Sequence, residues 1–160
     1  MSEQSLLPVF AALAGVAMAQ GVAMLQSWLD RENKREILLR TKYEELGLHF
    51  LESMRLPHAL MEAKSTEAIL ALTHQSSSNK AQLLALVYFP LLLQAIGEYT
   101  ESYSALCIAS ASLYNPDDKR ELAKQVYDKP EYIQQRNRHL AARDHLQEEI
   151  QRYAQQYVKS

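Results

Sequence analysis

Hydrophobic and polar positions are distributed very unevenly along the chain. No residue from Gln4 to Leu29 is ionisable, and the core of this stretch, LLPVFAALAGVAMAQGVAMLQSWL, has 24 residues. As a helix it would rise about 36 Å, which is enough to cross a hydrocarbon core about 30 Å thick with some tilt. We therefore predict a transmembrane helix within residues 1–30 and a separate helical domain over residues 31–160.

The residues that flank this predicted span give it an orientation. Trp28 lies at its far end, where interfacial aromatic residues are enriched, and Arg31, Lys34 and Arg35 follow. No Lys or Arg precedes the span, so the positive-inside rule places the N-terminus outside and the rest of the chain in the cytoplasm. We expect these three basic residues to lie near anionic headgroups of the lipid bilayer.

Two other interpretations of the N-terminal stretch stay open. A signal peptide could end at the small residues Ala17-Met18-Ala19, although its first residues carry no positive charge and the apolar run continues beyond that site. A soluble core helix would normally have a polar stripe, whereas the polar residues here are only Gln20, Gln26 and Ser27. The anchoring span accounts best for the whole stretch.

Small residues recur at every fourth position of the predicted span, at Ala11, Gly15, Ala19, Ala23 and Ser27. Positions four apart form a ridge along one side of a helix. A ridge of small side chains lets a second backbone approach closely in lipid. Gln20 lies beside this ridge near mid-membrane, where its amide would seek the Gln20 of another copy. We therefore predict a homo-oligomer that associates through the span.

The pattern after the span is helical, without useful strand-like alternation. We expect the first helix to continue to about Met54, or to Lys64 with a kink at Pro57. TEAILALTH predicts a short helix and HQSSSN (74–79) predicts a loop. A long helix from Lys80 to Tyr114 should kink near Leu86, or split, because of Pro90. Residues 81–97 are uncharged, so a second membrane segment is the alternative to a core helix there.

Two capping patterns predict the C-terminal helices. In residues 115–118, Asn115 can cap a new helix with Pro116 at its first position, and residues 128–131 repeat the device. The last helix should run from Pro130 to about Val158. Its apolar stripe is Leu146, Ile150, Tyr153 and Tyr157. The expected fold class is all-α, with an N-terminal transmembrane helix that continues into a cytoplasmic bundle of about four helices.

Composition excludes several classes of site. The net charge of −2 predicts no general attraction to nucleic acid. Cys107 is the only cysteine, so no internal disulfide can form, and its apolar neighbours predict a buried, inert thiol. His145 lies three residues before Glu148, which is weak evidence for a metal site, and no glycine-rich phosphate loop is present. We expect no catalytic residue, metal or cofactor, and hence no enzyme.

One group of residues in the last helix could bind an anion. Arg136 and Arg143 are seven residues apart and therefore on one face, with His139 between them. Such a face could hold a nucleotide or a phospholipid headgroup. The alternative is a solvated basic face whose charge is balanced by Asp144 and nearby glutamates.

Two runs of sequence resemble a pattern found in small, N-terminally anchored bacterial inner-membrane proteins. Within about residues 28–103 the matching residues are Lys42, Tyr43, Glu44, Glu45 and Leu46, then Tyr88, Phe89 and Pro90. Where that pattern often has Glu after Tyr-Phe-Pro, this chain has Leu91. Many such proteins are similar to cargo of prophages and mobile elements. The resemblance implies a bacterial inner membrane and a setting in phage defence or superinfection control. With the orientation given by the positive-inside rule, the N-terminus would be periplasmic.

These observations predict a non-enzymatic, membrane-tethered interaction module. It would self-associate through its span and bind a cytosolic protein or a membrane partner through its bundle. The alternative is a membrane effector of antiphage defence. In that case the bundle would sense a small anionic ligand, such as a nucleotide held by Arg136 and Arg143, and the packed spans would perturb the bilayer.

Overall fold

A computed structural model describes the backbone of residues 7–74 and 77–158 and the side chains of residues 18–73 and 77–157. Within these ranges every regular element is a helix, so the predicted all-α class is confirmed. The elements are α1 (Leu7–Ser53), α2 (Leu56–Met61), α3 (Thr66–His74), α4 (Ser77–Tyr88), η2 (Pro90–Leu92), α5 (Leu93–Leu113), α6 (Leu122–Val126) and α7 (Pro130–Val158).

The chain divides into two units, Met1–Leu39 and Arg40–Ser160, and α1 contributes to both. In the first unit, every residue from Met18 to Leu38 is exposed. The second unit is a helical bundle that holds the buried residues of the described chain.

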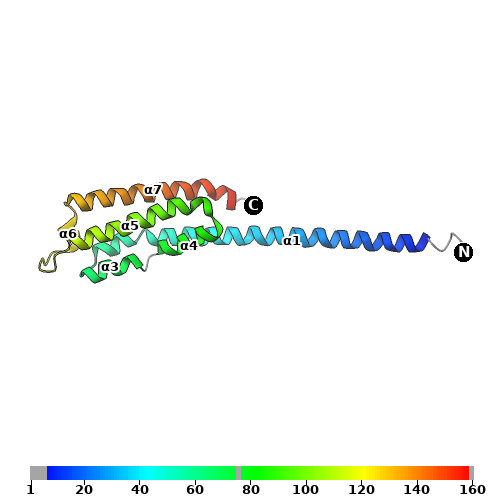
Figure 1. Ribbon diagram of the computed structural model, residues 1–160, viewed down its shortest axis with the longest axis horizontal. Helices are drawn as coiled ribbons and strands as arrows, with labels where there is room; N and C mark the ends of the chain where they lie inside the picture. Colours follow the sequence, from blue (N-terminus) through cyan, green and yellow to red (C-terminus); the bar gives the residue numbers. More distant parts are fainter. Residues whose placement is uncertain (1–6, 75–76, 159–160) are drawn as a thin grey trace. The chain divides into compact units, whose positions relative to one another are not determined.

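The bundle is organised around α5, which packs against α3, α4 and α7 (Figure 1). Within the described residues, five helices of the bundle have nine or more residues. They are the C-terminal part of α1, then α3, α4, α5 and α7. The sequence predicts about four, and the region from Lys80 to Tyr114, predicted as one kinked or split helix, holds two of the five, α4 and α5. The short helices α2 and α6 complete the bundle.

The end of α1 enters the bundle through one stripe of side chains. Tyr43, Leu46, Phe50 and Ser53 are each at most 5% exposed, and their spacing of three, four and three residues places them on one helix face. The Tyr43 hydroxyl donates a hydrogen bond to the carbonyl oxygen of Ile150 in α7. These contacts fix the last turns of α1 against the bundle.

Aromatic rings join α1, α7 and Phe89, the residue between α4 and η2. The Phe89 ring meets the rings of Tyr43 and Tyr157 edge-on, with centroids 5.2 and 4.9 Å away. Phe89 is fully buried. Offset and edge-to-face pairs of this kind stabilise a core beyond the area they bury.

A second cluster of buried residues joins α2, α3, α5, α6 and α7. It consists of Leu60, Ile69, Tyr103, Leu106, Cys107, Leu122, Val126 and Tyr132. Burial raises the pKa of the Cys107 thiol, which keeps it protonated. The predicted burial of this cysteine is confirmed.

Several predicted helix boundaries are confirmed. The first helix ends at Ser53, α3 coincides with TEAILALTH, and α7 begins at Pro130 and ends at Val158. The expected break at Pro90 is a split, because α4 ends at Tyr88 and Phe89 leaves the helical region with φ −133° and ψ 64°. Proline lacks an N–H and disfavours helical geometry in the residue before it, which explains this position of the break.

The prediction of a loop over residues 74–79 is wrong in part. Residues 77–79 form the first turn of α4 instead of a loop, and the Ser77 hydroxyl donates to the Glu52 carboxylate at 3.2 Å. The remaining positions of that predicted loop include residues 75 and 76, which lie outside the described residues. A serine at the start of a helix can use its hydroxyl in this way without interrupting the backbone hydrogen bonds.

The prediction of a helix that begins at Pro116 is wrong, because the next helix, α6, starts only at Leu122. Asn115 instead forms a turn, in which its side-chain oxygen accepts the N–H of Asp117 at 3.0 Å. The buried Gln125 accepts the Asn115 N–H and donates to the carbonyl oxygens of Asp118 and Arg120. Because a side chain satisfies these backbone groups, this segment needs no helix.

None of the helices within the described residues is both long and apolar enough to span a bilayer. The uncharged residues 81–97 are divided between α4, η2 and α5. The predicted N-terminal span begins on residues 1–17, whose side chains lie outside the described residues.

Candidate functional site

A cavity of about 370 Å³ lies between α2 and α7. It is lined by Met54, Pro57, His58, Met61, Leu106, Tyr132, Arg136, His139, Leu140 and Arg143. All three residues that the sequence singled out for anion binding, Arg136, His139 and Arg143, therefore line one cavity.

The periodicity of α7 explains why these side chains meet there. Tyr132, Arg136, His139 and Arg143 are spaced by four, three and four residues, so they share one face of the helix. Tyr132 and His139 are only 4% and 2% exposed, which fixes this face against the bundle. The opposite wall comes from residues 54–61, which are remote in sequence.

His139 is held in the core as a neutral side chain. Its Nδ1 lies 3.1 Å from the Ser102 hydroxyl, and its ring stacks on Tyr99 with centroids 5.0 Å apart. Burial lowers its pKa to about 4, and the nearby positive charge of Arg143 contributes in the same direction. The interpretation of this helix face as wholly solvated is therefore wrong at His139.

The hydrogen bonds assign a tautomer to this imidazole. The Ser102 hydroxyl donates its only proton to the Tyr99 carbonyl oxygen at 2.7 Å. Its oxygen must then accept the bond from His139, so Nδ1 carries the ring proton. Among the residues of α7 that line this cavity, the positive charge consequently comes from Arg136 and Arg143.

The two arginines have different partners. The Arg136 guanidinium carbon lies 4.9 Å from the centre of the Tyr127 ring, and its buried Nε has no hydrogen-bond partner among the described residues. Arg143 donates through Nε and Nη2 to Asp144 Oδ1, at 2.9 and 2.6 Å, at a partly exposed position. The pairing of Arg143 with Asp144 agrees with the charge balance expected from the sequence.

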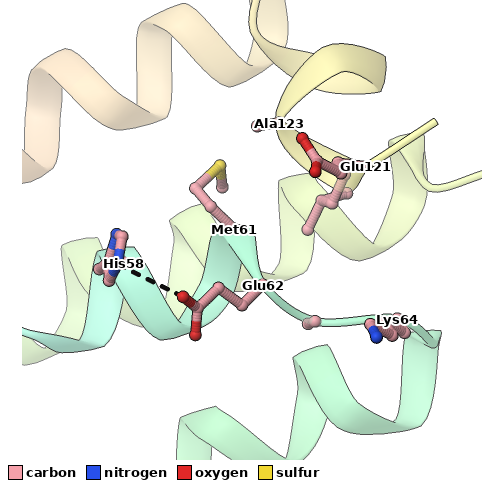
Figure 2. Close-up of a pocket in the computed structure, with 8 residues that line it drawn as sticks. His58, Met61, Glu62, Lys64, Glu121 and Ala123 are labelled. Atoms are coloured by element: carbon pink, nitrogen blue, oxygen red, sulfur yellow. Dashed lines mark ion pairs between the residues drawn. The ribbon is translucent and has the colours of Figure 1, made fainter.

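A larger neighbouring hollow of about 610 Å³ lies between α2 and α6 (Figure 2). Met61 points from α2 toward α6, and His58 forms an ion pair of 3.4 Å with Glu62 (Figure 2). His58 and Met61 also line the cavity beside α7, so α2 separates the two spaces. Glu62, Lys64 and Glu121 give the larger hollow mixed charge, which favours no single sign of ligand.

Sequence reasoning missed an exposed apolar stripe on α4 and η2. Leu83, Leu86, Val87 and Leu91 are each between 56% and 62% exposed. A shallow groove of about 450 Å³ adjoins this stripe and is lined in part by Leu93. The signal was present in the uncharged run from 81 to 97, which the sequence could not divide into buried and exposed faces. Exposed apolar patches commonly mark interaction surfaces.

The first unit exposes apolar side chains along α1. Six large residues are each 52–76% exposed: Met18, Val22, Met24, Leu25, Trp28 and Leu29. Of the predicted ridge, Ala19, Ala23 and Ser27 are exposed, as is Gln20, whereas the side-chain positions of Ala11 and Gly15 lie outside the described residues. The basic flank of Arg31, Lys34 and Arg35 is also exposed.

The acidic residues of α5 form exposed ion pairs. Glu98 lies 3.4 Å from His145, and Glu101 lies 3.6 Å from Arg138. His145 also lies 4.0 Å from Glu149. Within the described ranges, no group of three or more His, Cys, Asp or Glu side chains is arranged to hold a metal ion.

Comparisons with family models, curated proteins and solved structures return no match to this chain.

Proposed function

We propose that this protein is a membrane-anchored helical interaction module. Its N-terminal stretch holds it in a bilayer, and its bundle presents binding surfaces in the cytoplasm. The observation that carries this proposal is the run of large, exposed apolar side chains on α1, which begins at Met18 and ends at Leu29. The sequence continues this run back to Gln4 without a charge.

Covering the exposed apolar side chains of α1 between Met18 and Leu29 would be energetically favourable. Burying a large apolar side chain is worth about 1.5–3 kcal/mol, so covering six half-exposed ones is worth on the order of 1 kcal/mol each. Soluble proteins rarely leave such a contiguous apolar surface in water. A bilayer covers all sides of a helix, and residues 4–29 have the length that a span needs.

The flank of this stretch supports one orientation. Trp28 lies where a headgroup region would be, and Arg31, Lys34 and Arg35 follow in exposed positions. Basic residues near the cytoplasmic surface are attracted to anionic lipids. This arrangement supports an orientation with the bundle in the cytoplasm and the N-terminus on the opposite side of a bacterial inner membrane.

The bundle supplies the interaction surface of the proposed module. The stripe of Leu83, Leu86, Val87 and Leu91 is apolar and exposed on one side of α4 and η2. A partner protein with an apolar face could cover it, since such patches become the centres of interfaces.

Cysteine labelling tests the proposed orientation. In a Cys107→Ser background, a cysteine is introduced at Ser2 or at Lys119, an exposed residue of the loop before α6. A membrane-impermeant maleimide applied to spheroplasts should label Ser2→Cys at once and Lys119→Cys only after permeabilisation. Labelling of Lys119→Cys in intact spheroplasts would contradict the proposed orientation.

Substitutions on the small-residue ridge test self-association. The variant Gly15→Ile with Ala19→Ile should convert oligomers into monomers in mild detergent, because branched side chains keep the backbones apart. The matched control, Ala14→Ile with Ala17→Ile, places the same side chains on the other side of a helix with 100° per residue. Sedimentation in detergent measures both variants. Equal effects of the two pairs would exclude the ridge as the interface.

A further inference from the structure

We propose that the cavity between α2 and α7 binds a small organic molecule through a phosphate group. Arg136 and Arg143 hold the phosphate, and the apolar wall of the cavity holds the remainder of the molecule. This inference does not depend on the membrane anchor, because all residues that line the cavity belong to the bundle.

The charge of the lining favours an anion. Arg136 and Arg143 both line the cavity, and no Asp or Glu is among the described residues that do so. The Asp144 carboxylate, which does not line the cavity, pairs with Arg143. Two guanidinium groups in one cavity provide the planar, bidentate donors that match phosphate oxygens.

Arg136 has a donor without an acceptor within the described ranges. Its Nε is buried and has no acceptor among the described residues, although buried polar groups in proteins are nearly always paired. The Tyr127 ring, 4.9 Å from the guanidinium carbon, orients the plane of this group. Rotation of the Arg136 side chain toward the cavity that it lines would give Nε–H a phosphate oxygen as its acceptor.

Arg143 can be recruited by the same phosphate. Its bond to Asp144 joins neighbouring residues of α7 at a partly exposed position, where the Arg143 side chain is 36% exposed. Exposed ion pairs of this kind are weak. A doubly charged phosphate can therefore compete with the single carboxylate for this guanidinium.

The size and walls of the cavity select the class of ligand. A volume of about 370 Å³ lies within the range of small-molecule sites and exceeds what an inorganic phosphate would fill. The apolar lining consists of Met54, Pro57, Met61, Leu106 and Leu140. A phosphate monoester with an apolar or aromatic moiety fits both features. A free nucleotide and the headgroup region of a phosphatidate lipid share this chemistry.

Isothermal titration of the full chain in mild detergent tests the proposal. The probes are adenosine monophosphate, inorganic phosphate and dihexanoyl phosphatidic acid, each up to about 1 mM, where binding free energies near 4 kcal/mol are still measurable. Binding of adenosine monophosphate identifies a free nucleotide as the source, and binding of the phosphatidic acid alone identifies a lipid. Absence of binding by both organic phosphates would overturn the proposal.

Variants on one helix separate the site from general electrostatic attraction. Arg136→Gln and Arg143→Gln should each weaken binding roughly tenfold or more, because each removes a charged, bidentate donor. Arg138→Gln is the matched control, since Arg138 pairs with Glu101 and does not line the cavity. Equal weakening by all three variants would overturn the proposal. Arg143 is partly exposed, so its variant decides the matter if Arg136→Gln unfolds the bundle.

Discussion

His139 should make the stability of the bundle depend on pH in a way that a single substitution removes. The imidazole is 2% exposed, lies 3.1 Å from the Ser102 hydroxyl and stacks on Tyr99. The groups that face it also include Tyr103 and the positive Arg143. Burial lowers the pKa of His139 from its ordinary value of 6.5 to about 4.

The direction of the effect follows from this lowered pKa. Between pH 6.5 and pH 4 the unfolded chain binds a proton at His139 more readily than the folded chain does. The contribution of the neutral His139 to the free energy of unfolding is complete above pH 6.5, its pKa in the unfolded chain. It is lost as the pH falls toward about 4, its pKa in the folded chain. The shift corresponds to about 3 kcal/mol in total, of which about 1.4 kcal/mol is lost by pH 5.5.

Urea unfolding followed by circular dichroism measures the contribution of His139 to the pH dependence of the free energy of unfolding. The full chain in mild detergent is compared with His139→Gln at pH 7.5, 5.5 and 4.5, and the free energy of unfolding of the parent should fall more steeply. The carboxylates titrate alike in both proteins, so the difference isolates His139. The control is His58→Gln, whose side chain is 84% exposed in the parent and which should keep the parental slope. Parallel curves for the parent and His139→Gln would refute the reasoning.

Three further outcomes follow from the packing. Phe89→Ala should lower the free energy of unfolding by about 3–5 kcal/mol in urea titrations, because Phe89 is fully buried between aromatic rings. Ser53→Ala should cost about 1–3 kcal/mol in the same assay, since it leaves the buried Tyr99 hydroxyl, 2.9 Å from Ser53 Oγ, without its acceptor. Cys107 should react with a thiol reagent only after unfolding, because it is buried and its thiol pKa is raised, and rapid labelling of the native protein would contradict this.

The boundaries of several helices could be predicted because their signals are local. TEAILALTH has no helix breaker, Pro130 begins α7, and Pro90 divides the helix that contains it. Residues 77–79 were predicted as a loop and residues 115–118 as a helix start, and both predictions are wrong because serine and asparagine favour both caps and turns. The choice between these depends on remote partners, namely Glu52 for Ser77 and Gln125 for Asn115.

The cavity beside α7 could be predicted only in part. The spacing of Arg136, His139 and Arg143 indicated a common face, and all three line the cavity. The same spacing could not indicate that His139 is buried, because its burial depends on the packing of α7 against α5. The opposite wall, which includes Pro57 and Met61, is also set by tertiary packing. For the same reason the sequence could not reveal the exposed face of α4.

The central proposal is that residues 4–29 anchor the bundle in a membrane, and extraction of isolated membranes with alkaline carbonate tests it most directly. The full chain should stay in the membrane pellet, because a span of this length is removed only by detergent. A matched variant that lacks residues 4–29 and keeps the basic flank of Arg31, Lys34 and Arg35 should pass into the supernatant. Release of the full chain by carbonate would contradict the membrane anchor.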